Sequence, residues 1–390
     1  MPRKNAEQDA TAGSAHTLAA AYRRFGVEAV AKSSPLYGRV ADALAGSTDV
    51  LAAIGAMPAR RRNPVAILAA LHDLALSGQA PALASAYAVS DGDAAVVAAI
   101  DTLLRMTDSV IAVALRRPVR SDETGRHAVL YPAIAEGAHR IGAESVGLVD
   151  LGCGAGFNLN VDRVGITFSN GQVLGDLSSP LRQAASIVGN RPVPTTEIPH
   201  VVVCIGIDAT PIDVTDTDDA RWLSACLWPD KLVQAERLEA RTALAATATP
   251  LLRQGDPVEL LPDAIARVSG HALPVITTTW ALSSLSPGRR LNFLERLGDA
   301  AATPRRTVPS CASPSRVSGS PRKFPRLATA PPLATALSAS QGSTAPGSTA
   351  AEYCAPRPLA AAGRAAACCR GARDTCQSTA TMTSDALTTS

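Results

Sequence analysis

The segment VGLVDLGCGAGFNLN, residues 146–160, constrains the fold of this 390-residue chain more than any other. A mostly apolar run ends at Asp150, and three glycines follow at alternate positions, Gly152, Gly154 and Gly156. Glycine suits a sharp turn with positive φ and lets the backbone approach a ligand closely. The pattern indicates a buried strand that turns through these glycines into a helix, and the first N–H groups of that helix stay free. Such an arrangement predicts a nucleotide-type pocket at the carboxyl ends of parallel strands.

Before this segment the apolar spacing is helical. Residues 16–142 show the three–four rhythm of amphipathic helices, most clearly over 96–115. Shorter helices are predicted at 34–44 and at 63–76, where Pro64 suits a first helical turn. The pattern predicts an all-helical N-terminal subdomain, in which His72 is expected to be a hydrogen-bonded core histidine rather than a ligand. Trp222, in the later part of the chain, is expected to be a packing residue.

From residue 146 onward, short apolar runs alternate with helical stretches. The predicted strands are 146–151, 201–207, 250–253 and 274–279, and the predicted helices are 156–163, 218–226, 231–245, 258–268 and 287–300. This alternation predicts an α/β domain with parallel strands and crossover helices. The segment 164–198, with SNGQ at its centre, interrupts the alternation and predicts a hairpin and loop.

We therefore divide the chain into a disordered start (1–15), a helical subdomain (16–142), a Rossmann-like α/β domain (143–302) and a low-complexity tail (303–390). The tail is rich in Pro, Ala, Ser, Thr and Arg, and it lacks apolar periodicity. Such a composition cannot bury enough apolar surface to fold. Two interpretations stay open, a disordered tail and an out-of-frame translation of a GC-rich gene, and the second is favoured.

Composition narrows the function classes. The formal net charge is +3, but acids outnumber bases before residue 300, which argues against a nucleic-acid partner. No apolar run approaches the length of a membrane span, and the polar N-terminus lacks the apolar region of a secretory signal. We expect a cytoplasmic protein without a membrane partner. The cysteines show neither zinc-like spacing nor a disulfide framework, so no metal site is predicted, and the oligomeric state stays open.

The glycine spacing separates two classes of nucleotide site. The dinucleotide fingerprint GxGxxG would need a glycine at Phe157, whereas this chain has GxGxG directly after an acid and one apolar residue. DLGCGAG resembles the first motif of Rossmann-like S-adenosylmethionine-dependent methyltransferases. The resemblance continues in order through VCIGIDATP (203–211), RQGDPVELLP (253–262) and VITTTWALSSLSP (275–287).

This resemblance implies S-adenosylmethionine as the cofactor. It places Gly152, Gly154 and Gly156 beside the methionine and ribose end, and it makes Asp150 a cofactor contact. It also implies that Asp208 binds the ribose hydroxyls and that Asp256 lies near the adenine. The spacing departs from the usual pattern, because 58 residues separate Asp150 from Asp208 where about 20 is typical. The segment 164–198 accounts for the difference.

Candidates on the substrate side come from two places. Glu123 and Arg126 are three residues apart on one predicted helix face just before the first strand, where the resemblance puts the border of the pocket. An ordinary surface ion pair explains this spacing equally well. Trp280 follows the fourth strand, in the segment that flanks the transferred methyl group in such enzymes. No catalytic base can be named.

Over residues 20–300 the chain resembles a family of uncharacterised bacterial proteins, common in actinobacteria and known only as a domain of unknown function. The resemblance rests on RRFGVEAVAKSSPLYGRVADAL, SDETGRHAVLYPAI, GLVDLGCGAGFNLNVDR and IGIDATPIDVTDTDDARWLSACLWPD. Such proteins continue past the fourth strand with further sheet, and this chain does not, which supports the frame-error interpretation.

Two functions follow as expectations. The first is an S-adenosylmethionine-dependent methyltransferase acting on a small molecule. The second is a methyltransferase-like module that binds or regulates without catalysis. An NAD-dependent oxidoreductase is disfavoured by Phe157 and by the lack of a matching catalytic set.

Overall fold

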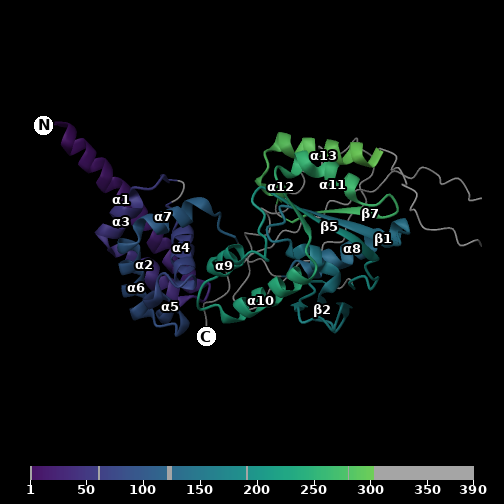
Figure 1. Cartoon of the computed structure of the whole chain (residues 1–390), viewed down its shortest axis with the longest axis horizontal. Helices are drawn as coiled ribbons and strands as arrows, with labels where there is room; N and C mark the ends of the chain where they lie inside the picture. Colours follow the sequence, from purple (N-terminus) through teal and green to yellow (C-terminus); the bar gives the residue numbers. More distant parts are fainter. Residues whose placement is uncertain (1, 60–61, 121–124, 190–191, 280, 303–390) are drawn as a thin grey trace, which may run out of the picture. The chain divides into compact units, whose positions relative to one another are not determined.

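The computed structural model describes residues 2–59, 62–120, 125–189, 192–279 and 281–302, with side chains from residue 16 onward. The predicted tail 303–390 lies outside these residues. The described part forms a region of helices followed by an α/β region with two small sheets (Figure 1).

The first region is helical, as predicted. Its helices are α1 (Pro2–Ala31), α2 (Pro35–Gly46), α3 (Thr48–Gly55), α4 (Pro64–Leu76), α5 (Pro81–Ala88), α6 (Gly92–Arg105), α7 (Thr107–Arg116) and α8 (His127–Ile141). Helix α1 starts at Pro2, so the structure differs from the disorder expected for 1–15. Alanine recurs through this segment and has the highest helix propensity of the amino acids, which favours the longer helix.

The amphipathic pattern over 96–115, predicted as one helix, belongs to two helices. The chain leaves helical geometry at Met106, between α6 and α7. The Thr107 hydroxyl donates to the Leu103 carbonyl at 2.7 Å, a local bond that competes with the helical pattern. Leu103 and Val110, on either side of the break, are both buried in the same core.

Helix α4 begins as its sequence predicts. Asn63 caps it by accepting the Val65 N–H at 3.0 Å, and Pro64 occupies the first turn. His72 on this helix is buried, and its Nδ1 lies 3.0 Å from the Leu227 carbonyl oxygen. The prediction of a hydrogen-bonded core histidine is confirmed.

The four predicted strands form one parallel sheet. They are β1 (Ser145–Leu151), β5 (His200–Asp208), β6 (Leu251–Gln254) and β7 (Leu273–Thr278). Their order across the sheet is β6-β5-β1-β7. Numbered among these four strands alone, the order is third, second, first, fourth. This is the order of the first four strands in doubly wound nucleotide-binding sheets.

Helices cover both faces of this sheet, because side chains alternate between the faces along each strand. Val146 and Leu148 of β1 pack with α8, whereas Val149 and Leu151 pack with α11 (Pro257–Arg267) and α13 (Pro287–Ala302). Figure 1 shows α11 and α13 on one side of the strands and α8 on the other.

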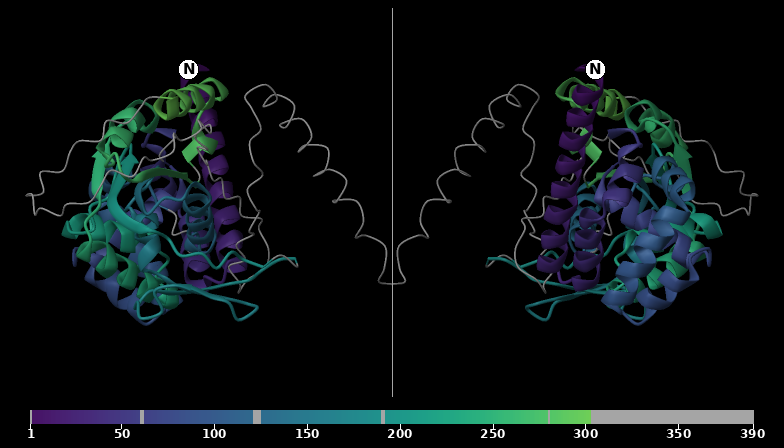
Figure 2. Two further views of the ribbon diagram at one scale, coloured as in Figure 1. Left: turned by 90° about the vertical axis from the view of Figure 1, so that its right-hand side faces the viewer. Right: turned by 90° about the vertical axis from the view of Figure 1, so that its left-hand side faces the viewer.

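The segment 164–198 contains the predicted hairpin. Strands β2 (Gly165–Phe168) and β3 (Val173–Gly175) are antiparallel, and β4 (Arg182–Ala185), which the sequence did not predict, pairs parallel with β2. Figure 2 shows this hairpin, in teal, extending as a separate arm. It adds chain between β1 and β5 without separating them in the sheet, which explains the long spacing between Asp150 and Asp208.

The connections of the α/β region are mostly the predicted helices. They are α9 (Thr217–Cys226), α10 (Leu232–Thr247), α11 and α13, with a short α12 (Ala281–Ser284) before α13. The helix predicted at 156–163 is instead a 3₁₀ segment, η2 (Phe157–Arg163), with non-helical geometry at Asn160. The prediction of a regular helix there is wrong, and so is the expectation that the start of a regular α-helix follows the glycines.

Helix α9 packs into the core of the helical region, although it lies between two strands in the chain. Trp222, Leu223 and Ala225 join the buried cluster of α1 to α7. The Trp222 indole N–H donates to the Pro118 carbonyl at 3.0 Å, and the Arg221 guanidinium bonds the buried Asp73 carboxylate at 2.9 Å. The two regions therefore share one core at α9.

Within the described residues, no single helix is long and apolar enough to span a membrane. Helices α4 and α5 reach that length and hydropathy only when taken together, and they meet at a bend of 100°.

Replacing Trp222 tests the packing of α9. Trp222 is only 1% exposed, so Trp222→Ala should lower the free energy of unfolding by about 3–5 kcal/mol through the cavity it leaves. Leu232→Ala is the control, because Leu232 is 66% exposed and its loss should cost less than about 0.5 kcal/mol. Urea denaturation followed by circular dichroism measures both. Equal midpoints for the two variants would contradict the shared core.

Candidate functional site

Polar groups meet at the carboxyl ends of β1, β5 and β7, on the face of the sheet that α8 covers. Asp150 is two residues beyond Leu148 and so shares its face, and it is in register with Thr277 of β7. Asp208 ends the neighbouring strand β5. Three segments far apart in the sequence thus deliver their polar side chains to one place.

Asp150 is fully buried and bonded on both oxygens. The Thr277 hydroxyl donates to Oδ1 at 2.7 Å, and the Asn158 amide donates to Oδ2 at 3.2 Å. Burial raises the pKa of the Asp150 carboxyl to about 6, although these two hydrogen bonds and the Arg126 charge oppose the shift. Asp150 therefore anchors the floor of the site.

The three glycines form a loop over the end of β5. Gly152, Gly154 and Gly156 have φ of +70°, +57° and +72°, which side chains rarely adopt. The Gly152 N–H donates to the Ile207 carbonyl at 2.7 Å. A Cβ on Gly152 would lie 2.9 Å from the Ala281 Cβ, whereas a Cβ on Gly154 would meet nothing within 4 Å. The predicted positive φ at Gly152 is confirmed, and Gly154 leaves open space.

Asp208 holds this loop in place. Its Oδ2 accepts the Gly154 N–H at 2.9 Å, and its Oδ1 accepts the Thr210 N–H at 2.9 Å. The Arg120 guanidinium lies 3.4 Å from Oδ1 and also donates to the Thr210 hydroxyl at 2.6 Å. Both carboxylate oxygens are thus already engaged by the chain itself.

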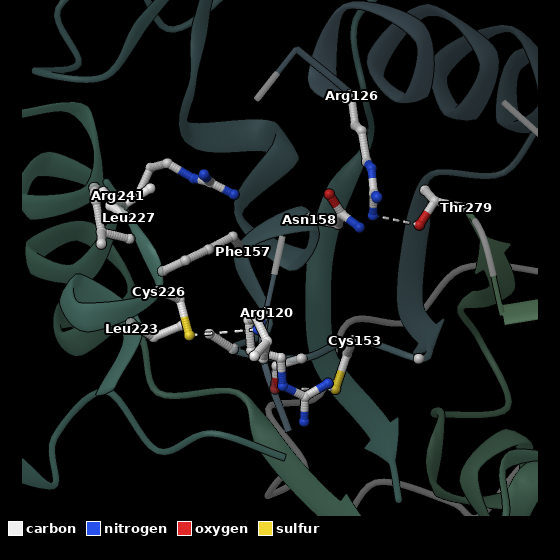
Figure 3. A pocket seen from close by; sticks show the side chains of 15 residues that line it. Arg120, Arg126, Cys153, Phe157, Asn158, Leu223, Cys226, Leu227, Arg241 and Thr279 are labelled. Atoms are coloured by element: carbon white, nitrogen blue, oxygen red, sulfur yellow. Dashed lines mark hydrogen bonds between the residues drawn. The ribbon is translucent and has the colours of Figure 1, made fainter. Parts of the chain in front are cut away.

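Above the glycine loop lies a cavity of about 250 Å³. The backbone of Gly152–Ala155 forms one wall, and Leu223, Leu227 and Leu238 of the α9–α10 segment contribute an apolar wall. Its polar lining comes from the side chains shown in Figure 3, among them three arginines, Asn158 and Thr279. The cavity lies at the carboxyl ends of the strands, where ligands bind in open α/β sheets.

Two of the arginines are held by neighbours. Arg126 donates to the Thr279 hydroxyl at 2.6 Å, and the Arg241 guanidinium stacks 4.2 Å from the centre of the Phe157 ring.

Behind Phe157, the buried His127 places Nε2 3.0 Å from the Phe157 carbonyl oxygen, so Nε2 carries the proton. Burial lowers the pKa of His127 to about 4, and the charges of Arg241 and Arg126 add to this shift.

The lining offers little nucleophilic or metal chemistry. Burial raises the pKa of the Cys153 thiol well above its ordinary range and that of Cys226 to about 11, so both are neutral near pH 7. Among the residues that the structure describes, no group of three or more His, Cys, Asp or Glu could hold a metal ion. The arrangement can bind and orient a ligand, and it suits reactions that need alignment rather than a general base.

The structure places the predicted cofactor residues differently. Gly152 and Gly154 line the cavity, and Asp150 and Asp208 support it from below. Gly156 does not line it and instead allows close packing, since a Cβ there would lie 3.1 Å from Pro250.

Asp256 stands apart from the cavity lining. It caps α11 by accepting the Val258 N–H at 2.8 Å, and it pairs with Arg289. Of the substrate-side candidates, Arg126 lines the cavity, whereas Glu123 and Trp280 lie outside the described residues.

The sequence interpretation missed Arg120, Arg241, Asn158 and His127. Arg241 carried a detectable signal, because it lies on the same stripe of α10 as the buried Leu238 and Ala245. A charged residue at a buried helical position is unusual and marks a functional candidate. The other three gave no local pattern.

Removing the Asp208 carboxylate should destabilise the fold. Asp208→Ala leaves the Gly154 and Thr210 N–H groups without an acceptor, so we expect the free energy of unfolding to fall by about 1–3 kcal/mol. Asp101→Ala is the control, since Asp101 forms an exposed pair with Arg105 that contributes under about 1 kcal/mol. Urea denaturation measures both, and an unchanged midpoint for Asp208→Ala would show that the loop does not depend on this carboxylate.

Asp150 and His127 should have opposite effects on stability between pH 6 and pH 4. As the pH falls, unfolded His127 gains a proton that the folded form excludes, which destabilises the fold. Folded Asp150 gains a proton that the unfolded form still lacks, which stabilises it. Between pH 6 and pH 4, the free energy of unfolding of Asp150→Asn should therefore fall by on the order of 2 kcal/mol more than that of the parent, as measured by urea titration.

His127→Gln is the matched counterpart in this experiment. Its free energy of unfolding should rise relative to the parent as the pH falls from 6 to 4, because the destabilising protonation of the unfolded His127 is removed. Identical pH slopes for the parent and both variants would contradict the assignment of these two groups.

A protein-family model described as "Uncharacterized protein conserved in bacteria (DUF2332)" matches residues 19–349. The match covers the helical region, the glycine loop and all four strands of the sheet, and it continues beyond residue 302. No curated protein and no solved structure matches the chain. The resemblance to a family of uncharacterised bacterial proteins is thus confirmed, and the chain belongs to the bacterial family DUF2332.

Proposed function

We propose that this protein is an S-adenosylmethionine-dependent methyltransferase of a small molecule, with a Rossmann-like methyltransferase-type domain. The observation that carries the proposal is the cavity above the GxGxG loop, into which Gly154 presents bare backbone at the carboxyl end of β1. A ligand can approach this backbone to van der Waals distance, which any side chain at residue 154 would prevent.

The strand order supports this proposal. From β1 the chain proceeds to β5 and β6 on one side of the sheet and then returns to β7 on the other. In doubly wound sheets this reversal point opens a crevice for the ligand. Gly152 from the β1 side and Thr279 from the β7 side both line the cavity, as a ligand at such a point requires.

The chemistry of the lining also fits methyl transfer. The methyl group of a sulfonium passes directly to a nucleophile of the acceptor, so catalysis depends mainly on proximity and alignment. The neutral thiols of Cys153 and Cys226 would not compete as nucleophiles. Leu223, Leu227 and Leu238 would shield the reacting groups from water.

A non-catalytic binding module is the second candidate, and Asp208 favours it. Because the Gly154 and Thr210 N–H groups and the Arg120 guanidinium already occupy this carboxylate, a ribose would have to share it or displace Arg120. The cavity of about 250 Å³ is also slightly smaller than the roughly 300–1,000 Å³ of typical ligand pockets. A nucleoside would therefore extend toward Asp208 only if Arg120 moved.

Titration calorimetry with S-adenosylhomocysteine tests the proposal, with NAD as the control ligand. The parent should bind S-adenosylhomocysteine and not NAD. Gly154→Leu should weaken this binding by at least tenfold, because the new side chain fills the open space above the loop. Absence of binding to the parent would overturn the proposed cofactor.

Gly142→Leu is the matched control for backbone strain. Gly142 ends α8 with φ of +71°, and a Cβ there also meets nothing within 4 Å. Both substitutions cost about 1–2 kcal/mol of left-handed backbone strain, so only a local effect on the ligand separates them. Equal loss of affinity in the two variants would assign the effect to stability rather than to the site.

A further inference from the structure

The cavity has a strongly positive lining. Three guanidinium groups reach it from different parts of the chain: Arg120 from the α7–α8 connection, Arg126 from the start of α8, and Arg241 from α10. The lining residues that the structure describes include no carboxylate, and residues 121–124 lie outside that description. Arg120 bonds Asp208 and Thr210 at one end of the cavity, and Arg126 and Arg241 lie at the other end.

Arg241 is oriented by its surroundings. It is only 9% exposed, and its guanidinium stacks on the Phe157 ring with the central carbon 4.2 Å from the ring centre. Stacking fixes the plane of a guanidinium and turns its N–H edge sideways, in the geometry that binds carboxylate or phosphate with two parallel bonds. In Figure 3 this edge points toward Asn158.

Arg126 faces the same region from the other side. Its bond to the Thr279 hydroxyl, 2.6 Å long, anchors the side chain at the end of β7. Figure 3 shows Arg126 and Arg241 extending from opposite sides toward Asn158. A guanidinium carries five N–H donors, so one side chain can hold a protein oxygen and a ligand oxygen together.

The neighbouring histidine reports the same electrostatic environment. His127 lies behind Phe157, and burial is the main cause of its lowered pKa, to which the charges of Arg241 and Arg126 add. A positive potential that disfavours a protonated imidazole favours an anion in the adjoining cavity.

We propose that Arg126 and Arg241 form an oxyanion site that takes a carboxylate or phosphate group of the ligand. The Asn158 amide, which donates one N–H to Asp150, has a second N–H that can serve as a further donor. This inference rests on the proposed function for the identity of the ligand. The oxyanion belongs either to the methionine carboxylate of the cofactor or to an acidic methyl acceptor. The site itself requires only the arginines and the cavity.

Inorganic phosphate is the probe for the site. At low ionic strength, phosphate should raise the melting temperature of the full chain more than sodium chloride of equal ionic strength does. Arg241→Met should reduce this phosphate response, the rise in melting temperature, at least fivefold. Arg237→Met is the matched control, because Arg237 lies on the exposed face of the same helix, and it should respond like the parent. Equal responses of Arg241→Met and Arg237→Met would overturn the proposal.

A second variant guards against misfolding of Arg241→Met. Arg126→Met removes the opposite arginine and should reduce the phosphate response to a similar degree. Arg241→Lys should recover only part of the response, since an ammonium supplies charge without the planar fork. Circular dichroism of each variant confirms folding before titration. Retention of the full response in both Arg126→Met and Arg241→Lys would assign phosphate binding to another site.

Two cofactor fragments distinguish the sources of the oxyanion. If it is the methionine carboxylate, Arg241→Met should weaken S-adenosylhomocysteine binding at least tenfold and leave 5′-methylthioadenosine, which lacks the carboxylate, unchanged. If it belongs to the acceptor, Arg241→Met should bind S-adenosylhomocysteine like the parent and lose only phosphate. If the parent binds phosphate but no S-adenosylhomocysteine, the proposed cofactor fails and the oxyanion site stands.

Discussion

The hydrogen bond from the Gly154 N–H to the Asp208 carboxylate, 2.9 Å long, connects the two strands on which the site is built. It fixes the loop after β1 to the end of β5, and the same carboxylate engages the Thr210 N–H and Arg120. Since Arg120 belongs to the connection between α7 and α8, the carboxylate also links the helical region to the sheet. The loop, the cavity above it and one of its arginines therefore depend on one buried acid, whose neighbours would otherwise be unpaired donors.

The regular part of the fold was predictable because it rests on short-range patterns. Apolar runs of strand length alternating with helical stretches predict parallel strands, and β1, β5, β6 and β7 follow from this alone. The glycine turn was equally predictable, because positive φ at Gly152 requires a specific residue type. The break at Met106 and the 3₁₀ geometry of η2 were not, since both depend on local competition between hydrogen bonds that apolar spacing does not record.

The site was less predictable than the fold, because its side chains come together only through tertiary packing. The resemblance to methyltransferase motifs made Asp150 and Asp208 candidates, yet their hydrogen bonds serve the loop and floor of the cavity as the chain stands. Helix α9 shows the same limit on a larger scale. Its place in the chain assigns it to the α/β region, but Trp222 belongs to the helical core. The apolar wall of the cavity results from this packing, and no motif encodes it.

The two ends of the cavity differ in charge, and this difference constrains how a cofactor would lie in it. Asp208 lies beneath the glycine loop and is paired with Arg120. Arg126 and Arg241 face the other end beside Phe157 and Asn158, where the Asn158 amide donates to Asp150. The proposed cofactor, S-adenosylmethionine, carries a cationic sulfonium and an anionic carboxylate, so electrostatics would favour the carboxylate toward Arg126 and Arg241 and the sulfonium toward the glycine loop. The bare backbone at Gly154 would then adjoin the sulfonium end, where close approach matters most. An acidic acceptor that bound the same arginines would reverse this arrangement. The group that occupies the proposed oxyanion site therefore decides the orientation of the whole ligand.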